Sequence, residues 1–191
     1  FGKFDFKNTY LDGSAAPNVK FEMDYPAILS AGIGYSKNKI DVALDYRFVN
    51  YKNTEGFKAK GWTSTASVAG FGWENISIVS AGVQYKGVKK LPLRVGYTYS
   101  SNPIKSELAF FSTPATAIIK NAYQLGLGYE LNNKFTLNAT YHHGTSSGST
   151  GGSLLNPMMI SPANPYGAIP NSNVSYKMTT DLVMIGLNYC F

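Results

Sequence analysis

The sequence predicts an all-β protein, an antiparallel β-barrel that spans a membrane. Apolar and polar residues alternate with a period of two in many short segments, which is the pattern of strands with two different faces. The connections between these segments are alternately short and long, as in transmembrane barrels. Tyrosines stand at the ends of the apolar faces, where amphipathic rings meet the boundary between membrane and water.

The composition agrees with this fold class and with one domain over residues 1–191. Charged residues make up 15% of the chain, which contains 14 Tyr and 11 Phe; an average soluble domain has about 25% charged residues. No run of about 18 apolar residues is present, which excludes a transmembrane helix. The remaining structure that crosses a bilayer is a closed barrel, because backbone N–H and C=O groups must be paired inside lipid.

The cysteine count, the N-terminal residues and the net charge limit the possible classes of protein further. Cys190 is the only cysteine, so an intrachain disulfide is excluded. The sequence starts at Phe1 without a signal peptide, so we expect that a signal was removed or that the start of the protein is missing. The net charge of +6 is compatible with binding to nucleic acid. However, the lysines fall in turns and loops, and no nucleic-acid-binding motif accompanies them. We therefore expect no nucleic-acid partner.

The alternation is clearest in seven segments. In residues 40–48, for example, Ile40, Val42 and Leu44 point to one face, and Asp41, Ala43 and Asp45 to the other. The seven predicted strands are residues 29–35, 40–48, 79–85, 91–99, 123–130, 135–142 and 183–191. Phe1, Phe4 and Phe6 are interpreted as the start of another strand, so that seven or eight strands are present.

The lengths of the connections predict the orientation. Short turns are expected at residues 36–39, 86–90 and 130–134, and long loops at 52–72, 100–121 and 144–178. Long loops of transmembrane barrels are extracellular, so the last strand is expected to run into the periplasm of a bacterial outer membrane.

A soluble barrel, with its apolar face inward, shows the same alternation. Two features favour the membrane. The polar face is rich in Gly, Ser and Thr, whereas a solvated exterior carries more Lys and Glu. The tyrosines of the apolar face form an aromatic girdle of Tyr35, Tyr85, Tyr99, Tyr129, Tyr141 and Tyr189.

The order of these segments resembles the FadL/TodX family of outer-membrane transporters of hydrophobic compounds. The likeness is carried by Met-Asp-Tyr-Pro-Ala at the start of residues 23–35, by the strand at 42–51, and by Arg-Val-Gly-Tyr with Asn-Pro-Ile in 93–104. It continues through Gln-Leu-Gly-Leu-Gly-Tyr in 124–131 and a Pro- and Asn-rich loop at 154–176, which is similar to Bacteroidetes-type members.

The resemblance implies a 14-stranded barrel with an N-terminal plug, of which this chain is the C-terminal half. The Asn-Pro-Ala motif of the plug does not occur, since Asn164-Pro165-Tyr166 belongs to a loop. A barrel of eight strands built from this chain alone, with a lumen filled by side chains, is the geometric alternative.

Polar residues of the strands mark the interior of the predicted barrel. They either line a lumen or form a structural hydrogen-bond network, and the network is the better interpretation of any single residue. The candidate lumen residues are Asp41, Asp45, Arg47, Arg94, Gln124, Glu130 and Asn138.

Two apolar patches interrupt otherwise polar loops. They either contact a hydrophobic ligand or partner, or pack over the mouth of the barrel. The candidate ligand-binding residues are Phe110, Phe111, Ile118 and Ile119 in one loop, and Leu154, Leu155, Met158 and Met159 in another.

Catalysis and metal binding have little support. His142 and His143 are the only histidines and, being adjacent, point to opposite faces of a strand. An enzyme is therefore the weakest of three hypotheses, and no cofactor or metal is expected.

The first hypothesis is passive uptake of hydrophobic compounds such as long-chain fatty acids or aromatic hydrocarbons. The rival is a structural or docking barrel within a larger outer-membrane secretion or uptake complex. Tyr189 and Phe191 resemble the terminal signal read by the barrel-assembly machinery. Expected partners are membrane lipid and lipopolysaccharide, a hydrophobic ligand, that machinery and other outer-membrane subunits.

Overall fold

A single antiparallel sheet dominates the computed structural model, which describes residues 2–9, 14–116 and 118–190. Its seven strands follow the order β11-β8-β7-β6-β5-β4-β3. The strands are β3 (Ile28–Lys37), β4 (Ile40–Val49), β5 (Ile76–Tyr85), β6 (Leu93–Ser100), β7 (Asn121–Glu130), β8 (Phe135–Thr145) and β11 (Thr179–Tyr189). All seven predicted strands are present, and with 8 to 11 residues each they are close to the roughly 9–11 residues that cross a bilayer as a tilted strand.

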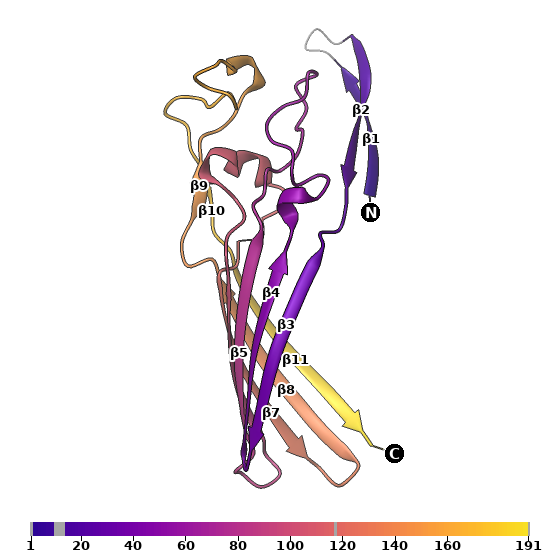
Figure 1. The fold of residues 1–191 in the computed structure, drawn as a ribbon, viewed down its shortest axis with the longest axis vertical. Helices are drawn as coiled ribbons and strands as arrows, with labels where there is room; N and C mark the ends of the chain where they lie inside the picture. Colours follow the sequence, from indigo (N-terminus) through magenta and orange to yellow (C-terminus); the bar gives the residue numbers. More distant parts are fainter. Residues whose placement is uncertain (1, 10–13, 117, 191) are drawn as a thin grey trace.

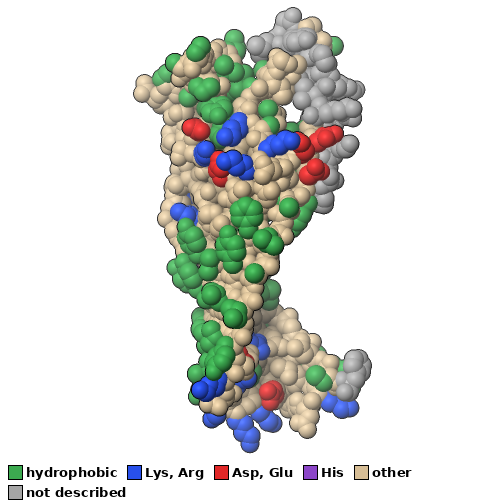
Figure 2. Space-filling view, viewed as in Figure 1, with side chains coloured by type: hydrophobic (Ala, Val, Ile, Leu, Met, Phe, Trp, Pro, Cys, Tyr) green, Lys and Arg blue, Asp and Glu red, His purple; other side chains and the backbone are tan. Residues whose placement is uncertain are grey.

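The apolar face of this sheet is open to its surroundings. Ile33 and Ile185, on the two edge strands, are 73% and 75% exposed, and Figure 2 shows hydrophobic side chains along the strands. Soluble proteins rarely expose continuous apolar surface of this extent. The face is therefore built for contact with lipid.

Two rings of tyrosine bound the apolar face. The strand register places Tyr46, Tyr97, Tyr99, Tyr123 and Tyr141 toward the long loops, and Tyr35, Tyr85, Tyr129 and Tyr189 toward the short turns. The structure thus places the predicted girdle tyrosines at both borders of the sheet, as in transmembrane barrels.

Short turns and long loops lie at opposite ends of the sheet, as predicted (Figure 1). At the turn end, Asn38 has a φ of 54°, a left-handed conformation that asparagine tolerates in tight hairpins. The strand predicted from residue 91 begins at Leu93, because Pro92 lacks the N–H that a ladder requires.

The long loops are folded and contain short elements that the sequence did not predict. These are the 3-10 helices η1 (Tyr51–Asn53), η2 (Ser106–Ser112) and η3 (Pro157–Met159), and the hairpin of β9 (Thr150–Gly152) with β10 (Val174–Tyr176). Segments of three to seven residues are too short to show a hydrophobic period.

The N-terminal segment forms a hairpin of its own, β1 (Gly2–Thr9) with β2 (Ala15–Met23), at the loop end (Figure 1). The strand expected at Phe4 and Phe6 is thus present as β1, although it pairs with β2 and not with the main sheet; Phe1 itself lies outside the described residues. β2 was not predicted. The hairpin packs on the β4–β5 loop through Phe21, whose ring centroid lies 6.0 Å from that of Phe71.

Both edges of the main sheet are open. Within the described residues, β3 pairs only with β4 and β11 only with β8, and the strands cross strongly in Figure 1, as in a twisted barrel wall. The described strands do not close into an eight-stranded barrel. None of the helices in the described part is long and apolar enough to cross a membrane.

Candidate lumen wall and loop core

The polar face of the sheet carries a continuous hydrogen-bond network at the turn end. Gln84 Nε2 donates to Asp41 Oδ2 over 2.8 Å, and Lys86 Nζ lies 2.8 Å from Asp41 Oδ1. Arg94 Nε donates to Gln84 Oε1 over 2.6 Å, and Arg94 Nη1 donates to Asn138 Oδ1 over 3.0 Å. The network joins β4, β5, β6 and β8, so the polar groups of this wall are fixed by one another.

Two glycines let Arg94 reach across β7. A Cβ at Gly126 would lie 3.4 Å from Arg94 Cβ, and one at Gly128 would lie 3.2 Å from Asn138 Oδ1. Larger side chains at these positions would occupy the path of the guanidinium group. The glycines of this face therefore allow the hydrogen-bond network to form, and they also leave space beside the wall.

Above the network lies a pocket of about 300 Å³ on the polar face. Its floor is Ala43 and Gly82, and its walls include Asp41, Gln84 and Arg94. The register aligns Ala43 with Gly34 on one side and Gly82 with Gly96 on the other, so small residues cross four strands at one height. This hollow faces the predicted lumen.

The predicted lumen residues divide into two groups. Asp41, Arg94 and Asn138 belong to the network, and Gln124 contacts His142, with 3.2 Å between Nε2 and Nδ1. Asp45, Arg47 and Glu130 occupy the same face by register, but no ion pair joins them within the described residues.

Gln84 and Gly82 belong to the wall although they were not among the predicted lumen residues. Their alternation placed them on the polar face, but only the register brings Gln84 between Asp41 and Arg94. Ser80 and Thr98, whose hydroxyl oxygens lie 3.0 Å apart, extend the same face toward the loops.

A hydrophobic loop core covers the loop end of the wall. Trp73, only 5% exposed, lies at its centre, with ring centroids 4.9 Å from Phe57, 5.0 Å from Tyr51 and 5.8 Å from Phe71. The indole Nε1 donates to Ser112 Oγ over 2.9 Å. The three long loops are therefore packed as one unit.

Part of the candidate ligand-binding set lies inside this packing. Phe111, Ile118 and Leu155 are buried, and Phe110 and Ile119 are half-buried. Phe110 and Phe111 lie beside Trp62, with centroids 6.3 Å and 5.0 Å away. A ligand would reach the buried members only if neighbouring loop residues moved.

The other members of the set form a separate tip. Leu154, Met158 and Met159 are exposed. Asn156 Oδ1 accepts from the Met158 N–H over 2.9 Å, and Asn164 binds the Met159 carbonyl oxygen at 3.2 Å. The methionines are therefore presented on a hydrogen-bonded turn.

An ion-pair cluster lies between the loop core and the sheet. Glu74 contacts Lys105 at 3.0 Å and Lys52 at 3.2 Å. Hydrogen bonds from Lys105 and Lys52 lower the pKa of the Glu74 carboxyl, and the same contact raises the pKa of Lys105. Nearby, burial raises the pKa of Tyr176, whose hydroxyl donates to the Ala109 carbonyl over 3.1 Å.

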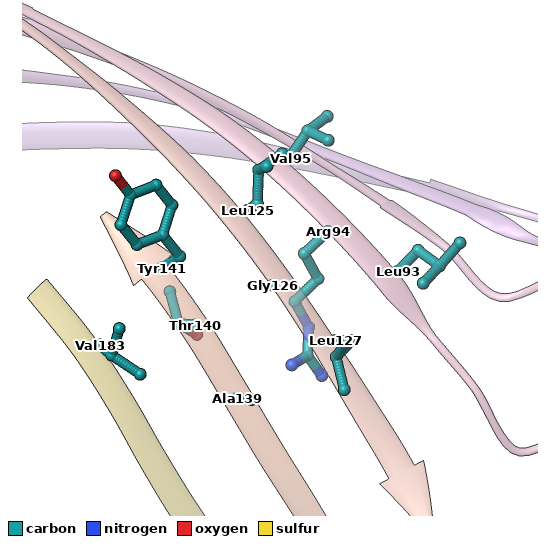
Figure 3. Close-up of a pocket in the computed structure, with 10 residues that line it drawn as sticks. All are labelled: Leu93, Arg94, Val95, Leu125, Gly126, Leu127, Ala139, Thr140, Tyr141 and Val183. Atoms are coloured by element: carbon teal, nitrogen blue, oxygen red, sulfur yellow. The ribbon is translucent and has the colours of Figure 1, made fainter. Parts of the chain in front are cut away.

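A larger cavity of about 460 Å³ lies on the opposite, apolar face (Figure 3). Leu93, Val95, Leu125 and Tyr141 surround it, and Ala139 forms the low point between taller neighbours. Because this face is built for contact with lipid, acyl chains are expected to occupy the hollow. We therefore place the candidate site on the polar face and not here.

The histidines point to opposite faces, as predicted. His142 contacts Gln124, and His143 Nδ1 lies 2.8 Å from Asp181 Oδ1. The described residues contain no group of three His, Cys, Asp or Glu side chains that could hold a metal ion. Of the predicted assembly signal, the Tyr189 ring lies 4.8 Å from that of Phe135; Phe191 lies outside the described residues.

The comparisons with known proteins agree with this architecture. Residues 5–188 match the family described as outer membrane protein transport protein (OMPP1/FadL/TodX). The chain belongs to this family. The predicted family resemblance is thereby confirmed, together with the bacterial outer membrane as the family's location. No curated protein matches the sequence.

Among the solved structures, the fold is similar to the crystal structure of a Pseudomonas aeruginosa FadL homologue. The sequences are 13% identical and the TM-score is 0.56. The match covers 89% of this chain but 35% of that chain, so this chain spans about a third of the length of the solved relative. The likeness supports the fold of an antiparallel β-barrel wall.

Proposed function

We propose that the protein is an outer-membrane channel for passive uptake of hydrophobic compounds, such as long-chain fatty acids or aromatic hydrocarbons. The observation that carries this proposal is the pocket on the polar face, floored by Ala43 and Gly82. Small residues leave room for a ligand beside the wall, while the fixed polar groups orient it. Membership of a family of outer-membrane transport proteins supports the same function.

The proposal includes an orientation. The long loops and the loop core face the outside of the cell, and the short turns and the C-terminal end of β11 face the periplasm. Residues 1–191 then act as one domain of barrel wall, whose open edges at β3 and β11 pair with further strands. Backbone groups at open edges need such partners inside lipid.

A pair of substitutions on neighbouring residues of β5 tests the pocket. Gly82→Leu is expected to lower uptake of radiolabelled palmitate or toluene by roughly tenfold, because the side chain fills the pocket. A Cβ at Gly82 has only the Val95 carbonyl oxygen nearby, at 3.8 Å, so the barrel is expected to fold. Uptake is measured in cells that express equal amounts of heat-modifiable, folded protein.

Ala81→Leu is the matched control, since residue 81 lies at the same height on the apolar face. It is expected to leave uptake unchanged. Equal uptake in both variants at equal expression would contradict a ligand path along this pocket.

A docking barrel is the second candidate, favoured by the hydrogen-bonded, exposed tip at Met158 and Met159. In that case Met158→Asp would release a partner subunit without changing palmitate uptake. The mass of the complex on a blue native gel distinguishes the candidates. A complex of unchanged mass, with unchanged uptake, would remove the tip as a docking site.

A further inference from the structure

A second pocket lies on the apolar face at the turn end, where β3, β4 and β5 meet, and it has a volume of about 350 Å³. Val42 and Ile40 supply its apolar surface, and Tyr35 and Tyr85 of the turn-end girdle line it. Lys37 and Lys39 complete the lining. The pocket therefore has an apolar floor that suits an acyl chain and a positively charged rim.

The placement of these lysines is unusual for the sheet. Lys37 continues the apolar alternation of Ile33 and Tyr35, so it lies on the lipid-facing side at the membrane border. Neither Lys37 nor Lys39 makes an ion pair with any described residue, whereas Lys86 on the polar face is paired with Asp41. Figure 2 shows cationic side chains gathered at this end of the molecule.

The Tyr85 ring is held beside the pocket by the local backbone. A Cβ at Gly87 would collide with the Tyr85 hydroxyl and ring, so the ring lies over this glycine. The hydroxyls of Tyr35 and Tyr85 have no hydrogen-bond partner among the described residues. Two phenol groups and two ammonium groups thus surround the pocket with free donors.

We propose that this pocket binds one anionic phospholipid of the leaflet at the turn end. The phosphodiester accepts from the Lys37 and Lys39 ammonium groups and the two tyrosine hydroxyls, and an acyl chain lies over Ile40 and Val42. Charge complementarity favours this occupant, because lysines at a membrane surface attract anionic lipid headgroups. The assignment of the site to one leaflet depends on the orientation given under the proposed function, whereas the pocket itself does not depend on it.

Native mass spectrometry of the full-length protein in detergent micelles tests the site. Dioleoyl phosphatidylglycerol is titrated against the protein and its K37Q/K39Q variant, with phosphatidylcholine, lipid A and glycerol 3-phosphate as competing probes. We expect the apparent Kd for phosphatidylglycerol to rise roughly tenfold in K37Q/K39Q. The K89Q/K90Q variant, which removes the same charge from the neighbouring turn, is expected to change it less than about twofold.

An equal rise of the apparent Kd for phosphatidylglycerol in both double variants would overturn the proposal. It would mean that the lipid is attracted by the overall positive charge at the turn end and not by this pocket. Equal binding of phosphatidylcholine would remove the role of net charge, and full competition by glycerol 3-phosphate would assign the site to a free phosphate. Stronger binding of lipid A than of phosphatidylglycerol would reject the proposed ligand. Since the readout needs neither transport nor insertion in cells, its failure would leave the proposed channel function untouched.

Discussion

Replacing Leu125 with arginine is expected to lower the free energy of unfolding of the membrane-embedded protein by about 2–4 kcal/mol. Leu125 is 59% exposed on the apolar face in the middle of β7, level with Val95 and Tyr141 of the adjacent strands. An arginine at this height must keep its charge in hydrocarbon or distort the bilayer around it. The measurement is the urea midpoint of folding into lipid vesicles, followed by the heat-dependent shift on a gel.

Gln124→Arg is the matched control, because residue 124 is the neighbour of Leu125 on the opposite face. Its side chain meets the polar wall beside His142, so the urea midpoint is expected to change much less. If Gln124→Arg were the more damaging substitution, the faces would be reversed and the sheet would enclose an apolar interior, as in a soluble barrel.

The faces of the sheet were predictable because side chains of a strand alternate with a fixed period of two. The face on which Ile33 or Val95 lies depends only on its position within its own strand. It does not depend on which strand pairs with it. Turn lengths were predictable for a similar local reason, since Asn38-Lys39 supplies a two-residue hairpin. Local rules therefore determined most of the barrel wall.

Contacts between strands were not predictable in the same way. The link from Gln84 to Arg94, and from Arg94 across β7 to Asn138, depends on register and on the glycines that clear the path. Nothing in the alternation separates a network member such as Arg94 from Arg47, which stands on the same face without a described ion pair. The alternation therefore assigns these residues to one face of the sheet but cannot rank them as members of a network.

The long loops were the hardest part to predict, because they show no hydrophobic period. Phe111 and Leu155 look like exposed patches in sequence, yet each is buried against residues from another loop. Trp73 falls in none of the predicted strands, although it lies at the centre of the loop core. Packing between distant segments is the information that a single sequence lacks.

Trp73→Ala is expected to open this loop core, at a local cost of about 3–5 kcal/mol. The substitution removes the ring that contacts Tyr51, Phe57 and Phe71, and it leaves the buried Ser112 hydroxyl without its donor. Because the strands lie in lipid, the loops can unfold locally while the sheet persists. Limited proteolysis of intact vesicles measures the effect, and cleavage in the loops is expected to accelerate on the order of 10²-fold.

Two controls separate this expectation from a general loosening of the loops. Met158→Ala, at a side chain that is 73% exposed, is expected to leave the cleavage rate unchanged. Trp73→Phe keeps an aromatic ring in the core but loses the indole hydrogen bond, so an intermediate rate is expected, for a loss of about 1 kcal/mol. A wild-type cleavage rate in Trp73→Ala would contradict this expectation. It would mean that the β9–β10 hairpin and the backbone hydrogen bonds keep the loops folded. The aromatic core would then form because the loops fold, and would not be what holds them together.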